Sequence, residues 1–237
     1  MYSVRTIKEP VSTTVTVPGS KSYTHRMLIA AVLSDGECII ENALDSEDTR
    51  LTAKALELMG ASMRWEGTSI VVEGNGGRLK AVGSHIDLNN SGTSMRLLTA
   101  AAALGGAPYT LTGSKRMQQR PIQDLIDSLK QIGVSVHAVA ENGCPPIEIC
   151  GPPKRGGAVE VNCELSSQFL SALMLIAPCV PGGLDISVKK GPVSKPYVDI
   201  TVEVMQAFGI NIERSGYERF HIAGDQTYQN GTYSVEP

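Results

Sequence analysis

The segment Val17–Leu33, VPGSKSYTHRMLIAAVL, joins a short polar and cationic turn to a helix that is apolar on nearly every side. A helix that is apolar all round is normally buried inside a protein. The turn first suggests a nucleotide phosphate loop, but that motif needs a Gly-Lys-Ser/Thr run with another glycine five residues earlier. Here Ser20 separates Gly19 from Lys21, and position 14 is threonine, so the segment does not match a nucleotide loop.

The same pattern, a hydroxyl-rich start followed by an apolar helix, occurs twice more. The three apolar stretches are YTHRMLIAAVL, SMRLLTAAAAL and SQFLSALMLIA, and each follows a short alternating stretch: TVTVPGSKS, HIDLNNSGTS or VEVNCELSS. A second marker, an apolar-Gly-apolar triplet, recurs at Gly60, Gly133 and Gly209, about 75 residues apart. Two markers that share one period indicate a threefold internal repeat.

Each repeat reads as strand, helix, strand, helix, strand, strand. The second helix is amphipathic, most clearly where apolar residues follow three-four spacing at Ile122, Leu125, Ile126, Leu129 and Ile132. The pattern predicts an α+β fold, an α/β prism of three βαβαββ units with the helices buried and the sheets outside. We place the repeats at about 14–83, 84–155 and 156–226. Residues 1–13 and 227–237 are interpreted as extended segments that lead from and toward a second domain.

Composition narrows the class of protein. The 237 residues carry a net charge of -3, which argues against a general nucleic-acid binder. The five cysteines form no Cys-x-x-Cys pair, as expected of reduced thiols in a cytoplasmic protein. The longest apolar run is too short to span a bilayer, and MYSVRTIKEP lacks the apolar core of a signal peptide. We therefore expect a cytoplasmic protein without nucleic-acid or membrane partners.

The three apolar helices all begin with residues suited to anions. Unpaired N–H groups and a positive partial charge make a helix start favour negative ligands. If the repeat brings these starts together, they form one anion-binding floor, to which Arg26 and Arg96 add charge one turn further on. Arg120 precedes the second helix of its repeat, and Lys195 holds the corresponding place in the third. The alternative is that each serine or threonine is an ordinary helix cap.

Metal and cofactor chemistry find no support in the sequence. The four histidines, His25, His85, His137 and His221, do not cluster, and no spacing typical of metal ligands occurs. We expect a small ligand with several phosphate or carboxylate groups and no cofactor.

Five ordered motifs carry a family resemblance that covers essentially the whole chain. They are PGSKSYTHR, NNSGTSMRLL, KRMQQRPI, ELSSQFLSALM and VSKPYVDIT. Together they resemble the enolpyruvyl transferases, and most closely the N-terminal half of the members that act on shikimate 3-phosphate. The resemblance implies two domains of three units each, with the active site in the cleft between them. It also implies transfer of the enolpyruvyl group of phosphoenolpyruvate to the 5-hydroxyl of shikimate 3-phosphate, with release of phosphate. In the family this reaction belongs to aromatic amino acid biosynthesis, and glyphosate inhibits it by competing at the phosphoenolpyruvate position.

The resemblance also implies roles for individual residues. Lys21 would be catalytic and would contact both substrates. The residues expected to bind shikimate 3-phosphate are Lys21, Ser22, Arg26, Ser166, Ser167, Gln168, Ser194 and Tyr197. Those expected to bind phosphoenolpyruvate are Lys21, Gly92, Arg120 and Gln168, with Gly92 allowing close approach of the backbone.

Three alternatives stay open. The related transferase acting on UDP-N-acetylglucosamine typically has a cysteine before the equivalent of Arg120, whereas this loop reads SKRMQQR. RNA 3'-phosphate cyclase has a similar repeat but lacks the ordered motifs. Family members are about twice as long, so the chain is expected to bind shikimate 3-phosphate without turnover unless the C-terminal domain is supplied. A non-catalytic binding module is the remaining alternative.

Overall fold

The computed structural model describes residues 6, 10–15, 17–80 and 83–237. Its α-helices are α1 (Lys21–Leu33), α2 (Glu47–Leu58), α3 (Gly92–Ala102), α4 (Gln123–Gln131), α5 (Gln168–Ile176) and α6 (Pro196–Ala207). Two 3-10 helices, η1 (Met117–Gln119) and η2 (Ala177–Cys179), complete the helical elements of the described residues. None of the helices in this part of the chain is long and apolar enough to cross a membrane.

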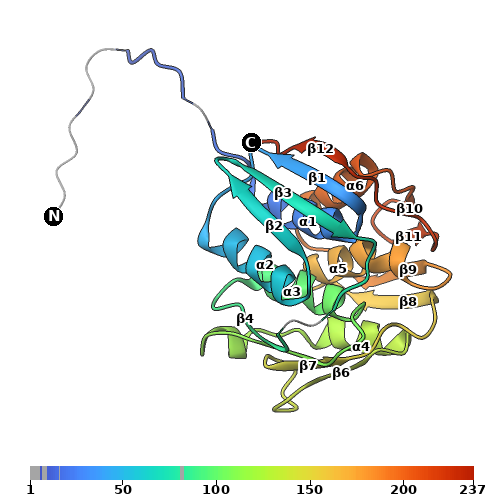
Figure 1. The fold of residues 1–237 in the computed structure, drawn as a ribbon. Coiled ribbons are helices and arrows are strands. Elements are labelled where there is room, and N and C mark those ends of the chain that lie inside the picture. The colour runs from blue at the N-terminus through green and yellow to red at the C-terminus, as the bar shows by residue number, and fades with distance from the viewer. Residues whose placement is uncertain (1–5, 7–9, 16, 81–82) are drawn as a thin grey trace.

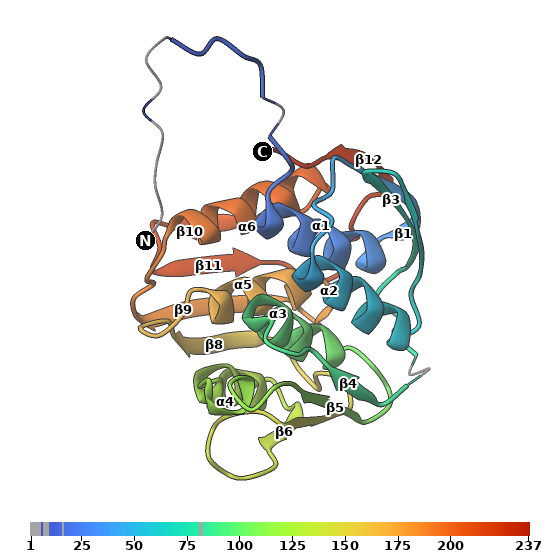
Figure 2. The same ribbon diagram turned by 90° about the vertical axis from the view of Figure 1, so that its left-hand side faces the viewer.

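Three four-stranded mixed sheets surround the helices (Figures 1 and 2). The first has the order β12-β1-β3-β2, with β1 (Asp35–Glu41), β2 (Ser62–Glu66), β3 (Ser69–Asn75) and β12 (Gly231–Ser234). The second has the order β4-β5-β7-β6, with β4 (His85–Asp87), β5 (Tyr109–Thr112), β6 (Ser135–Ala138) and β7 (Ile147–Cys150). The third has the order β10-β11-β9-β8, with β8 (Gly157–Asn162), β9 (Leu184–Lys190), β10 (Glu213–Ser215) and β11 (Arg219–Ile222). The predicted α+β prism of three units is therefore confirmed.

The first sheet differs from the sequence prediction in one strand. The alternating stretch before Pro18 was expected to open the first unit, but the described residues there form no strand, and Thr16 lies outside them. The position beside β1 that was expected for this opening strand is occupied by β12. This strand runs parallel to β1, with Cys38 opposite Gly231. In the other two units the opening strands β4 and β8 make the same parallel pairing with β5 and β9. Residues 231–234 thus complete a sheet of the prism.

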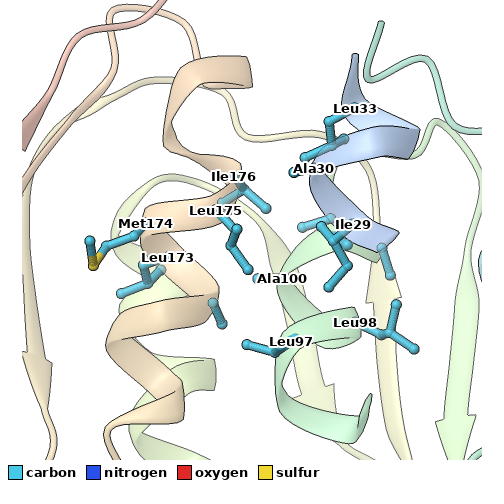
Figure 3. Close-up of a cluster of buried hydrophobic side chains, with 14 of the residues drawn as sticks. Ile29, Ala30, Leu33, Leu97, Leu98, Ala100, Leu173, Met174, Leu175 and Ile176 are labelled. Carbon is cyan, nitrogen blue, oxygen red and sulfur yellow. The ribbon is translucent and has the colours of Figure 1, made fainter. Parts of the chain in front are cut away.

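The core lies between the three apolar helices, as their composition predicts. Helices α1, α3 and α5 pack together at the centre, and α2, α4 and α6 pack around them. Figure 3 shows Ile29, Ala100 and Leu175 meeting between the three inner helices, and each is at most 1% exposed. Burial of this kind of apolar surface contributes about 25 cal/mol per Å², so the inner bundle holds the three units together.

The glycines of the repeated triplet close the outer helices. Gly60, Gly133 and Gly209 follow the last residues of α2, α4 and α6, with φ angles of 95°, 84° and 82°. Residues with side chains rarely adopt these angles, whereas glycine does so without strain. The spacing of these glycines in the sequence is therefore the spacing of a turn that recurs once in each unit, at the end of its outer helix.

Candidate anion site at the helix starts

The N-cap side chains of α1, α3 and α5 do not bond to the backbone N–H groups of their own helix starts. The N-cap residues Ser20, Ser91 and Ser167 make no side-chain cap hydrogen bond. Ser46 provides a contrast within the same chain, because it forms a complete capping box with Thr49 at the start of α2. Ordinary capping therefore does not explain the serines of the three inner helices.

Hydrogen bonds draw these helix starts together. The amide of Gln168, at the start of α5, donates to Thr93 Oγ1 on α3 at 3.0 Å and accepts from Arg96 Nη1 at 2.9 Å. At the start of α1, Lys21 Nζ lies 2.9 Å from Asp48 Oδ2 on α2, and Ser94 on α3 donates to the Asp48 backbone carbonyl at 3.3 Å. The candidate site is this group of contacts, which we call the helix-start site.

Lys21 and Asp48 form the only ion pair we find within the helix-start site among the described residues. The Lys21 side chain is 49% exposed and that of Asp48 is 32% exposed. Burial by itself raises the pKa of Asp48, but the hydrogen bond and charge of Lys21 outweigh it and hold the pKa below its ordinary value. Asp48 is thus a carboxylate at neutral pH, and Lys21 is accessible enough to turn toward a bound anion.

Arg96 and Arg120 add two further cations. Arg96 is 9% exposed, and its Nε is buried without a hydrogen-bond partner in the described structure. Burial, followed by the nearby charge of Arg120, lowers the pKa of Arg96 to about 10. The guanidinium of Arg96 remains charged at neutral pH, and an anion placed between Arg96 and Arg120 relieves the repulsion between the two side chains.

Arg120 lies directly against the backbone of Gly92. A Cβ built on Gly92 would lie 2.3 Å from Arg120 Nη1 and 2.6 Å from Nη2. The start of α3 and the guanidinium can approach so closely only because position 92 has no side chain. Gly92 and the guanidinium of Arg120 therefore lie directly side by side.

Arg26 occupies a different environment from the one expected of a surface cation. It is 1% exposed and donates to Ser22 O, Thr201 Oγ1, Ser171 Oγ and Tyr197 O, at distances between 2.7 and 3.2 Å. Burial lowers its pKa to about 10. The side chain links the start of α1 to α5 and α6, so it brings Ser22 and Tyr197 toward each other. One of its five N–H donors, on Nη1, makes no hydrogen bond within the described residues.

The remaining predicted residues border the same region. Ser22 is the second residue of α1 and Ser167 is the N-cap of α5, and neither side-chain hydroxyl makes a hydrogen bond within the part of the chain that the structure describes. Ser166 Oγ accepts from the Gln168 backbone N–H at 3.2 Å. Ser194 and Tyr197 are exposed at the start of α6. Lys195 instead places its Nζ 5.0 Å from the centre of the Tyr217 ring.

Sequence reasoning missed Asp48, and it left the partner of Arg96 unidentified. Asp48 lies in the first turn of α2, where an acidic residue is common because it interacts favourably with the helix dipole. A local pattern of this kind carries no sign that Lys21 will lie beside it. Arg96 was noted for its charge, but its partner Gln168 is 72 residues away.

The chain matches known proteins over almost its whole length. The family described as EPSP synthase (3-phosphoshikimate 1-carboxyvinyltransferase) matches residues 5–237. The 3-phosphoshikimate 1-carboxyvinyltransferase of Methanospirillum hungatei is 42% identical over 230 residues, which are 96% of this chain and 53% of that protein. The corresponding protein of an Enterobacter species is 43% identical over 230 residues, which are 95% of this chain and 54% of that protein.

A solved structure also has the same fold. The EPSP synthase of Acinetobacter baumannii superimposes with a TM-score of 0.83 and 26% sequence identity, covering 93% of this chain and 49% of that chain. The chain thus spans about half the length of the curated relatives it matches. From its repeats, its fold and these matches together, the chain belongs to the EPSP synthase (3-phosphoshikimate 1-carboxyvinyltransferase) family.

Proposed function

We propose that this chain binds shikimate 3-phosphate at the helix-start site and supplies one wall of an active site that transfers the enolpyruvyl group of phosphoenolpyruvate to it. Both substrates carry phosphate and carboxylate groups, which match a surface of helix starts and fixed cations. The observation that carries the proposal is the contrast in capping. Ser46 caps α2, whereas Ser20, Ser91 and Ser167, at the N-cap positions of α1, α3 and α5, make no side-chain cap hydrogen bond.

The proposed roles follow from accessibility and charge. Lys21 reaches both anions, because its side chain is half exposed at the start of α1. Ser22, Ser166 and Ser167 donate hydroxyl hydrogen bonds to shikimate 3-phosphate, and Tyr197 and Ser194 border its ring. Arg26 acts mainly by holding these residues in place.

Phosphoenolpyruvate is assigned to the surface formed by Gly92 and Arg120. The guanidinium fork of Arg120 matches a carboxylate or phosphate in two parallel hydrogen bonds. Gln168 lies between the two substrate positions, since it already bonds to Thr93 and Arg96. Lys21 then stabilises the negative charge that the departing phosphate carries.

We also propose that the chain alone binds substrate without turning it over. General acid-base catalysis needs a positioned group within hydrogen-bond reach of the reacting atom. The acidic residue identified at the helix-start site, Asp48, is already paired with Lys21. Exclusion of water also requires a second wall that closes over the substrates. Transfer is therefore assigned to the chain together with the other half of a full-length relative.

Calorimetric titration of shikimate 3-phosphate into the chain tests the binding step, with shikimate as the control for the phosphate. We expect saturable binding of shikimate 3-phosphate and at least about tenfold weaker binding by Lys21→Met, since a charge-assisted hydrogen bond is lost. Lys130→Met is the matched control, because Lys130 is an exposed lysine near the end of α4, and it should bind like the wild type. Absence of binding by the wild type at millimolar ligand would contradict the proposal.

Phosphate release tests the catalytic step. The chain is mixed with the C-terminal half of the Methanospirillum hungatei relative, and inorganic phosphate is measured with both substrates present. We expect turnover from the mixture and none from either half alone. Binding without recovered turnover would assign the chain the role of a binding module.

A further inference from the structure

A cavity of about 580 Å³ lies at the end of the inner bundle opposite the helix-start site. The ends of all three inner helices line it: Leu33 is the last residue of α1, Leu104 follows α3, and Cys179 follows α5. Figure 3 shows Leu33 and Ile176, the last residues of α1 and α5, toward the same end of the bundle. The volume is typical of a site for a small molecule, and none of the residues proposed to touch substrate lines it.

Each of the three units also contributes a loop to the wall of this cavity. Gly76 and Gly77 follow β3, Pro152 and Pro153 follow β7, and residues 225–227 follow β11. These strands hold corresponding places in the three units, so the cavity lies where the repeats meet. We call it the axial cavity.

The wall of the axial cavity is largely apolar and rigid. Leu33, Leu104 and Val180 line it together with four prolines, whose rings fix the backbone φ angle. The loop of residues 225–227 is held by Gln226, whose side chain accepts from the Asn211 backbone N–H at 2.8 Å and donates to Asn211 O and Ala223 O. A wall that is formed before binding lowers the entropic cost of holding a ligand.

The helix ends at the axial cavity are negative and uncompensated. The C-terminal end of a helix carries a negative partial charge, which a basic residue in the last turn stabilises. The outer helix α4 has Lys130 in this position, whereas α1, α3 and α5 have no basic residue there. The backbone carbonyls of Leu33, Leu104 and Cys179 accept no hydrogen bond from any residue that the structure describes. Acceptors for a cationic donor are therefore present.

The one acidic or basic residue among the described residues that line the axial cavity is Asp225. Its carboxylate accepts no hydrogen bond and forms no ion pair within residues 10–15, 17–80 and 83–237, and it is exposed. Burial raises the pKa of the Cys179 thiol to about 11, so this group stays neutral. Two cations in the adjoining loops bond to backbone carbonyls instead: Arg78 Nε donates to Asn75 O at 3.3 Å, and Arg155 Nε donates to Gln131 O at 3.2 Å.

We propose that the axial cavity binds an organic ammonium ion, a protonated amine carried on a compact apolar body. The ammonium donates to Asp225 and to free carbonyls of the helix ends, and the body packs against the prolines and leucines. A metal ion does not suit this site, because the described residues contain no group of three or more potential metal ligands. The proposal does not rest on the proposed function, since the helix-start site lies at the other end of the bundle.

Titration with phenethylamine, which is protonated at neutral pH, tests the proposal. Phenethyl alcohol has nearly the same shape without the charge, and hydrocinnamate carries a carboxylate on the same ring. By calorimetry we expect saturable binding of phenethylamine in the millimolar range, about tenfold weaker binding of the alcohol, and none of hydrocinnamate. Failure of phenethylamine to bind, or equal binding of the alcohol, overturns the proposal.

Two readings show where the amine binds. Asp225→Asn should weaken phenethylamine about tenfold, whereas Asp127→Asn, which changes an exposed carboxylate on α4, should bind like the wild type. Cys179 provides the second reading in a chain carrying Cys144→Ser and Cys150→Ser, because the two remaining other cysteines are buried. Phenethylamine should slow the reaction of Cys179 with methyl methanethiosulfonate in proportion to the occupied fraction. An unchanged rate at saturation, or an unchanged affinity of Asp225→Asn, places the amine elsewhere and overturns the proposal.

A third test needs no ligand. Thr227 is exposed at the cavity wall, so Thr227→Lys supplies an ammonium from the chain itself, and Thr227→Glu supplies the opposite charge. The lysine variant should unfold at a higher temperature than the glutamate variant at low ionic strength, and salt should reduce the difference. The lysine variant should also no longer bind phenethylamine. Equal unfolding temperatures for the two variants would show that the cavity is not negative and would overturn the proposal. None of these readings uses shikimate 3-phosphate, so failure of the proposed function leaves them unaffected.

Discussion

The backbone of Gly92 and the guanidinium of Arg120 occupy adjoining space, so that a Cβ on Gly92 would lie 2.3 Å from Arg120 Nη1. Alanine at this position must therefore push the guanidinium aside. The displaced group is the free end of a flexible side chain, so Gly92→Ala should change the free energy of unfolding by less than about 1 kcal/mol. Phosphoenolpyruvate affinity, measured by calorimetry with shikimate 3-phosphate present, should fall about tenfold because Arg120 loses its position.

Gly106, which lies beyond the other end of α3, provides the control for this substitution. A Cβ on Gly106 would meet no atom within 4 Å. Gly106→Ala should leave both stability and affinity unchanged. Equal affinity of Gly92→Ala and the wild type would remove Arg120 from the phosphoenolpyruvate site.

Arg26 is expected to be more important for stability than any exposed cation. Its buried guanidinium makes four hydrogen bonds that join α1 to α5 and α6. Arg26→Met leaves buried acceptors and hydroxyls without partners, and we expect a loss of about 3 kcal/mol or more in the free energy of unfolding. Urea unfolding measures the loss, with the exposed Arg116→Met as the control. Equal midpoints for the two variants would show that the buried contacts contribute little.

Serines at different helix starts should respond differently to alanine. Ser46 caps α2, so Ser46→Ala should cost about 1 kcal/mol of stability without weakening substrate binding. Ser167 makes no side-chain cap bond, so Ser167→Ala should weaken shikimate 3-phosphate binding with little change in stability. Thermal unfolding of both variants measures the change in stability, and calorimetry measures the change in affinity for shikimate 3-phosphate. The reverse pattern would mean that Ser167 is an ordinary cap.

Stability should fall in mild acid because of His25. Its pKa is lowered from 6.5 to about 4 by burial, so between these values the unfolded chain binds a proton that the folded chain does not. Stability therefore decreases as pH falls below 6.5, and the His25 contribution amounts to about 3 kcal/mol by pH 4. The difference between wild type and His25→Asn in urea unfolding at several pH values isolates this contribution. Parallel curves for the two proteins would contradict it.

The repeat made most of the fold predictable. Apolar residues all round a helix indicate burial whatever the surroundings, and glycines such as Gly60 and Gly133 report a backbone angle directly. The opening strand of the first unit was not predictable in the same way. The stretch before Pro18 and the segment Gly231–Ser234 both alternate like strands, and alternation does not specify the partner. Pairing with β1 is decided by tertiary packing.

In the candidate site, too, the sequence predicts the features that depend on local pattern and not those that depend on tertiary packing. The serines and cations at the starts of α1 and α3 could be found because their pattern is local and repeats. Asp48 lies 27 residues from Lys21, and Arg96 lies 72 residues from Gln168, so their pairing depends on how helices pack. Charge alone also does not indicate the environment of Arg26, since an arginine one turn into a helix can face either a ligand or the core.

The pairing of β12 with β1 has a consequence for how the protein is made. Asn42 and Val235, 193 residues apart, are joined by a hydrogen bond beside this pairing. The second and third sheets are built from strands of their own units, so each can close once its unit has left the ribosome. Of these three units, the one that is synthesised before the other two is therefore the last to be finished. Until residues 231–234 emerge, β1 has a free edge on which another nascent chain can pair, and an unpaired edge of this kind favours aggregation.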